Sequence, residues 1–162
     1  MSTYKLTIPH TPKAKASVRT GKWGGYYNPS CKGMNLTREH VKQALKDQPI
    51  KAPLNGPLLV IAHYRIPAPH ALPQRKRVAQ NNFPHTKKPD GDNLEKFLND
   101  ALNGVVWNDD SRISWLLRSK SITSEKVGET ILIVKELSDG KPDYETILDT
   151  IKEHIRFDDD DS

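Results

Sequence analysis

The chain has 162 residues, a net charge of +5 at neutral pH and a single cysteine, Cys31. This length suits one domain with its own core, and no apolar run approaches the ~20 residues of a membrane-spanning helix. One cysteine excludes an internal disulfide and, with no apolar signal segment at the N-terminus, favours a cytoplasmic protein.

The charge is divided unevenly along the chain. Residues 1–88 hold 16 Lys and Arg against 2 Asp and Glu, a net of +14, and residues 89–162 hold 9 against 18, a net of −9. A strongly basic surface attracts nucleic acid or anionic membranes. We expect nucleic acid, and not a membrane, to be the partner.

Three elements and a long loop are predicted in the basic half. Alternating apolar residues over 4–8 predict a strand, and glycines break the basic stretch that follows over 13–27. Thr37 is placed to cap a helix, and the β-rich run over 58–66 predicts a central strand. Residues 66–89 hold five prolines and an Arg-Lys-Arg run, which predicts a basic, Pro-rich loop that orders on nucleic acid.

The clearest element is a helix over residues 93–103. Asp92 suits its N-cap, with Glu95 as the capping-box partner, and Gly104 suits the left-handed position after its last turn. Its apolar residues recur at helical spacing, at Leu94, Phe97, Leu98, Ala101 and Leu102.

The remaining elements complete the predicted domain. Residues 113–120 and 130–134 are expected to pair as a hairpin, and a last helix is expected after Pro142. We predict an α+β fold, a two-layer mixed β-sheet with helices packed on one face, in a single domain over residues 1–156. The acidic residues 157–162 are predicted to form a disordered tail.

Carboxylates gather at both ends of the predicted 93–103 helix. In an extended entry segment, residues two apart point to one side, so Asp90 and Asp92 are expected to face one ion. Carboxylate oxygens favour Mg²⁺ or Mn²⁺. Asp109 or Asp110 completes the site if the chain runs back beside the helix start. Lys96 lies one turn beyond Asp92, where it can contact a phosphate or stabilise negative charge.

Each of these residues also has a simpler explanation. Asp92 can serve only as a cap, the pair Asp109 and Asp110 can serve only as a turn, and Lys96 can pair with Asp100 on a solvated face. These readings must all hold together beside a basic segment, which makes a shared site the better interpretation.

The stretch KPDGDNLEKFLNDALNGVVWNDD, followed by Ile113 and Lys120, resembles the RusA family of Holliday junction resolvases. The resemblance is dense over residues 87–120. It implies a homodimeric, Mg²⁺-dependent endonuclease of bacteria or phages that nicks two strands of a four-way DNA junction symmetrically, leaving 5′-phosphates, without a small-molecule cofactor. Gly91 departs from the family pattern, in which an apolar residue is more usual.

The resemblance also implies roles for individual residues. Asp90, Asp92 and Asp110 correspond to the metal-binding catalytic aspartates and Lys96 to the active-site lysine, with Asp109 as a helper. Basic residues expected to contact DNA are Lys13, Lys15, Arg19, Arg75, Lys76, Arg77, Lys87, Lys88 and Lys120.

Two other functions stay open. A nucleotidyltransferase also uses an Asp-x-Asp pair with a distant third aspartate, although the Gly-Ser pair typical of that class does not occur here. A non-catalytic DNA-binding module, in which the carboxylates are only caps, predicts junction binding that weakens with salt and is indifferent to Asp92→Asn.

Overall fold

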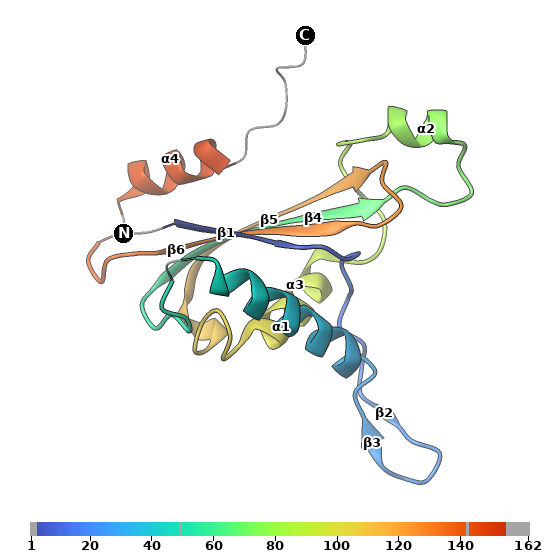
Figure 1. Ribbon diagram of the computed structural model, residues 1–162, viewed down its shortest axis with the longest axis horizontal. Coiled ribbons are helices and arrows are strands. Elements are labelled where there is room, and N and C mark those ends of the chain that lie inside the picture. The colour runs from blue at the N-terminus through green and yellow to red at the C-terminus, as the bar shows by residue number, and fades with distance from the viewer. Residues whose placement is uncertain (1–2, 49, 142, 155–162) are drawn as a thin grey trace.

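A four-stranded mixed sheet forms the centre of the molecule in the computed structural model (Figure 1). The structure describes residues 3–48, 50–141 and 143–154. The strand order is β1-β6-β4-β5; β6 pairs antiparallel with both β1 and β4, and β5 pairs parallel with β4. The bounds are β1 Thr3–Ile8, β4 Leu58–Pro67, β5 Ile113–Thr123 and β6 Glu129–Glu136.

Helices lie on both faces of this sheet. Helices α1 (Cys31–Lys46) and α3 (Gly91–Leu102) pack together on one face, and α4 (Tyr144–His154) lies against the other (Figure 1). Lys135 of β6 donates a hydrogen bond to Thr150 of α4, and this bond attaches α4 to the second face of the sheet. The predicted α+β fold with a mixed sheet is confirmed, and α4 adds a helix on the second face.

Strand β4 is the core of the sheet because it is apolar on both sides. Leu58, Val60 and Ala62 point into the cluster beneath α1 and α3, and Leu59 and Ile61 are buried on the opposite face. A strand of this kind is most stable between two neighbours. The predicted hairpin between residues 113–120 and 130–134 is therefore wrong, since β4 lies between β5 and β6.

Two helices have N-cap residues that differ from the predicted ones. Helix α3 begins at Gly91 with Asp90 as its extended N-cap, so Asp92 lies in the first turn and is not the cap. Helix α1 begins at Cys31, and Thr37 lies inside it, where its hydroxyl donates to the carbonyl of Gly33. Both predictions failed because several Ser, Thr and Asp residues near each start suit the N-cap. The predicted left-handed Gly104 is confirmed, with φ of +77°.

The predicted loop over residues 66–89 is more ordered than expected. It contains a short helix, α2 (Gln74–Ala79), and residues 82–85 then bond to the outer edge of β5. The amide of Asn82 donates to Ile122, and that of His85 donates to Lys120. The segment is thus a fixed part of the fold that leads the chain back to α3.

Two expectations concern the chain ends and membranes. The predicted acidic tail, residues 157–162, lies outside the described residues. Among the helices that the structure describes, none has the length and apolar character needed to cross a membrane.

Candidate functional site

Asp90 and Asp92 lie at the N-terminal end of α3, and β5 holds that end in place. The ammonium group of Lys120 donates to the carbonyls of Lys87 at 2.9 Å and Pro89 at 2.8 Å. On the other side, the amide of Lys15 donates to the carbonyl of Asn93 at 3.1 Å. The aspartates are exposed, and the positive end of the helix dipole favours their negative charge.

Gly91 leaves room for a side chain of β5 against the helix start. A Cβ at this position would lie 2.6 Å from Nε of Arg118. Arg118 extends past Gly91 and forms an ion pair with Glu95 at 2.8 Å. The departure at Gly91 therefore has a local cause, because a larger residue would displace the arginine.

Lys96 lies where the sequence predicts it. Its Nζ is 3.6 Å from Oδ2 of Asp92, one helical turn away, and both side chains are largely exposed. The alternative partner, Asp100, is paired with Lys15 instead. Lys96 thus presents its charge at the same end of α3 as the two aspartates.

The second acidic pair has divided roles. Asp109 is the N-cap of a single 3₁₀ turn, η1 (Asp110–Arg112), and its Oδ1 accepts a hydrogen bond from the amide of Ser111 at 2.9 Å. Hydrogen bonding by the side chain of Ser111, together with this amide bond, lowers the pKa of Asp109. Asp110 is exposed and does not cap the turn, which supports Asp110 as the freer carboxylate of the pair.

The structure does not bring the two acidic pairs together within one chain. Trp107, two residues before Asp109, donates its indole N–H to Asn103 just beyond the C-terminal end of α3, at 2.8 Å. Asp90 is at the other end of this 12-residue helix, a length of about 18 Å. Across residues 3–48, 50–141 and 143–154, no three acidic, His or Cys side chains form a group that can hold a metal ion.

The donor atoms therefore suit Mg²⁺, but their arrangement in a single chain does not. One hard cation takes oxygen ligands at about 2.1 Å. Two carboxylates at opposite ends of α3 cannot both reach such an ion. The expected convergence of Asp90, Asp92 and Asp110 does not occur in one described chain.

Similarity to known proteins decides how these residues are interpreted. The family model described as Endodeoxyribonuclease RusA matches residues 9–134. The chain belongs to the RusA family. This range includes all the candidate metal-binding, catalytic and DNA-binding residues named above and leaves α4 outside. No curated protein matches the chain. Membership in the RusA family supports a nuclease that acts on DNA.

The basic residues of this RusA-family chain fall into three groups. Lys13 and Arg19 are exposed between β1 and α1, and the second exposed group lies between β4 and α3, with Arg75 and Lys76 on α2 and Lys87 and Lys88 after it. Three predicted DNA contacts have structural partners instead, and one of them is Lys15, which pairs with Asp100. Arg77 is 5% exposed and donates to the carbonyl of Glu125, and the Lys120 ammonium is bonded to Lys87 and Pro89.

A projecting hairpin is a second candidate surface, and the sequence did not predict it as a hairpin. Strands β2 (Arg19–Thr20) and β3 (Tyr26–Tyr27) extend away from the body of the molecule (Figure 1). We call residues 18–27 the finger. Trp23 is 93% exposed and Tyr26 81%. The signal in the sequence is the group of glycines Gly21, Gly24 and Gly25, and Gly24 takes a positive φ in the turn.

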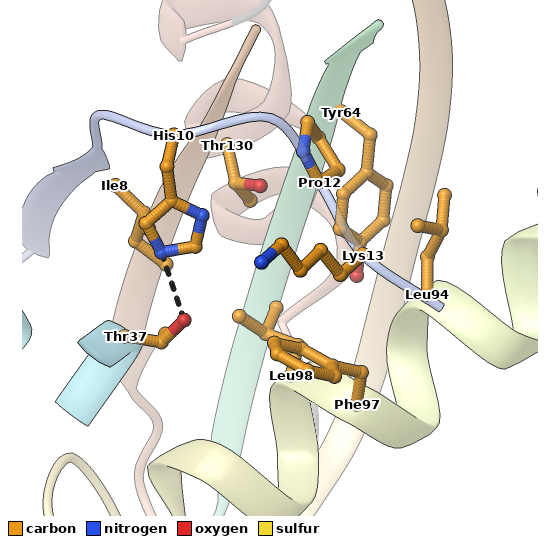
Figure 2. Close-up of a pocket in the computed structure, with 10 residues that line it drawn as sticks. All are labelled: Ile8, His10, Pro12, Lys13, Thr37, Tyr64, Leu94, Phe97, Leu98 and Thr130. Carbon is orange, nitrogen blue, oxygen red and sulfur yellow. Dashed lines mark hydrogen bonds between the residues drawn. The ribbon is translucent and has the colours of Figure 1, made fainter. Parts of the chain in front are cut away.

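The finger is tied to the helix that carries Asp90. Figure 2 shows the segment with His10, Pro12 and Lys13 crossing over Tyr64 of β4 and the apolar side chains of α3. His10 bonds to Thr37 there, and burial lowers its pKa. The segment that leads into the finger is therefore anchored on α3, whose first turn follows Asp90.

Proposed function

We propose that the chain is an Mg²⁺-dependent, structure-selective endonuclease that resolves Holliday junctions and other branched DNA by paired symmetric nicks. Mn²⁺ is the expected substitute, and the expected products carry a 5′-phosphate. The observation that carries the proposal is the exposed pair Asp90 and Asp92 at the start of α3, with Lys96 beside them, in a member of the RusA family. Such an enzyme serves DNA recombination and repair.

The residues around the helix start have complementary roles in this proposal. Asp90 and Asp92 supply the hard oxygen atoms that a nuclease of this class needs. Lys96 supplies a positive charge that stabilises the developing charge on the phosphate. Burial and the nearby Lys120 charge lower the pKa of His85, so this neighbouring ring is neutral and adds no charge.

Branched DNA is the proposed substrate because two features of the surface suit it. Exposed lysines and arginines attract the phosphate backbone without reading sequence. The exposed rings of Trp23 and Tyr26 suit stacking on bases that are unpaired at a branch point. Duplex DNA offers few such bases away from its ends.

The decisive experiment compares cleavage of a labelled four-way junction by wild-type protein and by Asp90→Asn, with and without Mg²⁺. We expect paired nicks in opposite strands by the wild type only, ligatable because they carry 5′-phosphates. Asp149→Asn is the matched control, an exposed aspartate on α4 far from α3. Equal activity of wild type and Asp90→Asn, or none in either, rejects the proposal.

The remaining functions give different results in the same assay. A non-catalytic module binds the junction and leaves it intact in both proteins. A nucleotidyltransferase, when a nucleoside triphosphate is added to the assay, transfers a nucleotide with release of pyrophosphate and does not nick the junction. We also propose a homodimer, because two equivalent sites match the two-fold symmetry of a four-way junction.

A further inference from the structure

We propose that Arg118 binds a phosphate of the DNA strand held at Asp90 and Asp92, and that Gly91 is the residue that leaves room for its guanidinium group there. The inference rests on the proposed function, because it takes DNA as the ligand of this site. It adds a residue that the predicted DNA contacts do not include. A guanidinium group suits a phosphate diester because it can offer parallel N–H groups to both free oxygens.

The guanidinium group of Arg118 lies against the backbone between the two exposed aspartates. A Cβ atom on Gly91 would lie 2.6 Å from Nε of Arg118 and 3.0 Å from both its Cδ and its Cζ. Only a hydrogen atom at this position leaves the arginine in place. Because Gly91 stands between Asp90 and Asp92, the cation is held beside the backbone that carries both carboxylates.

Two neighbouring rows of side chains along α3 each pair a carboxylate with a cation. Gly91 and Glu95 lie four residues apart on the face toward β5, where Nη1 of Arg118 donates to Oε2 of Glu95 at 2.8 Å. Asp92 and Lys96 form the adjacent row, with Nζ of Lys96 3.6 Å from Oδ2 of Asp92. Arg118 is thus a second cation at the end of the helix where Lys96 is the first.

The ion pair with Glu95 leaves most donors of Arg118 free. The guanidinium group has N–H donors on Nε, Nη1 and Nη2, and Glu95 accepts only from Nη1. In the part of the chain that the structure describes, Nε and Nη2 have no acceptor, and 39% of the side chain is exposed. Lys120, on the same face of β5, differs because the carbonyls of Lys87 and Pro89 already occupy its ammonium group.

The ion pair alone gives little reason for an arginine at this position. An ion pair between partly exposed side chains adds little to stability, because water already solvates both charges. A DNA strand at this place gains more from the arginine, since Asp90 and Asp92 repel phosphates and a nearby cation offsets that repulsion. In this arrangement Glu95 orients the guanidinium group, and the phosphate contacts its free donors.

Junction binding in the absence of Mg²⁺ tests the phosphate contact apart from cleavage. The affinity of wild type, Arg118→Met and Glu95→Gln for a four-way junction is measured at several salt concentrations. Loss of one phosphate contact lowers the slope of log affinity against log salt by about one. We expect this decrease for Arg118→Met and not for Glu95→Gln, which keeps the guanidinium group and removes a negative charge.

Arg65→Met is the matched control, because it breaks another partly exposed arginine–glutamate pair, with Glu129 at 3.3 Å, on the opposite face of the sheet. An unchanged slope for Arg118→Met overturns the inference. An equal decrease for Glu95→Gln overturns it too, because the effect then belongs to the ion pair, and so does an equal decrease for Arg65→Met.

These measurements separate the phosphate contact from the proposed nuclease activity. If the wild type cleaves the junction and Arg118→Met keeps the wild-type slope, the proposed function stands and this inference fails. If the wild type binds without cleaving and Arg118→Met lowers the slope, the nuclease proposal fails and the contact stands.

A double-mutant cycle tests the role of Gly91. Gly91→Val fills the space at the helix start and is expected to lower the salt slope as Arg118→Met does, because it displaces the guanidinium group. In the Arg118→Met background, the same substitution is expected to change the slope no further. Gly91→Ala, which favours the helix, replaces valine in the cycle if thermal unfolding shows that valine impairs folding. Additive decreases, or a wild-type slope for the Gly91 variant, overturn the coupling between the two positions.

Discussion

Replacing Lys120 by methionine separates two roles that the sequence cannot distinguish. The sequence assigns Lys120 to DNA binding, but in the structure its ammonium donates to the carbonyls of Lys87 and Pro89. These bonds hold the segment that enters α3 at Asp90. Methionine keeps most of the apolar stem and removes only the charged donor.

The expected magnitude comes from these two bonds. A hydrogen bond to a charged group contributes about 1.5–3 kcal/mol, and partial exposure of Lys120 reduces the sum to about 2 kcal/mol. If the bonds position Asp90 for the reaction, the cleavage rate at saturating junction falls about 30-fold. If Lys120 instead contacts a phosphate, affinity falls, and the slope of log affinity against log salt decreases by about one.

The assay measures single-turnover cleavage at saturating junction and, separately, junction affinity at several salt concentrations in the absence of Mg²⁺. Lys87→Ala, which keeps the carbonyl that Lys120 contacts, is the comparison for a lysine that binds DNA, and the exposed Lys126→Met is the control. A Lys120→Met protein with wild-type cleavage at saturation and a reduced salt slope refutes the positioning role.

Three further predictions address the finger, the buried anchor and pH. Trp23→Ala is expected to weaken junction affinity about 5- to 150-fold through lost stacking, without changing Tm, and unchanged affinity contradicts stacking. Asn103→Ala leaves the indole N–H of buried Trp107 without its acceptor and is expected to cost about 1–3 kcal/mol in urea unfolding, whereas Asn103→Asp costs less. Burial lowers the pKa of His63 from 6.5, so the unfolded chain binds the proton more readily. The contribution of neutral His63 to the free energy of unfolding is present above pH 6.5 and is lost as the pH falls below that value. His63→Gln is therefore expected to reduce the fall in the free energy of unfolding below pH 6.5, measured by urea unfolding at several pH values.

Helix α3 was predictable because its signals agree with one another. Five apolar residues share one stripe, and Gly104 ends it in the left-handed conformation. Its first residue was not predictable, because Asp90 and Asp92 are both good caps. The choice depends on the contact between Lys120 and Pro89, which joins residues 31 positions apart.

The sheet was predictable in composition but not in pairing. The alternation over β1 indicated a strand, and the long apolar run of β4 indicated a strand at the centre. The order β6-β4-β5 depends on which elements cover the two apolar faces of β4. No local pattern in the sequence predicts that choice.

The identity of the site residues was predictable from the motif, but their arrangement in space was not. The motif identifies Asp90, Asp92, Lys96 and the second acidic pair, but their convergence requires the chain after α3 to return along the helix. In the structure, Leu54 bonds to Val106 and Asn108, so this return does not take place.

The direction of β5 connects the wrong strand pairing with the divided site. Because β5 runs parallel to β4, it begins at the C-terminal end of α3 and passes the N-terminal end only at Arg118 and Lys120. The same direction separates Asp110, just before β5, from Asp90 at the start of α3. Gly91 fits this arrangement, since it gives Arg118 the space to pair with Glu95 beside the helix start. A single strand thus holds the start of α3, where Asp90 and Asp92 lie, through the contacts of Arg118 and Lys120.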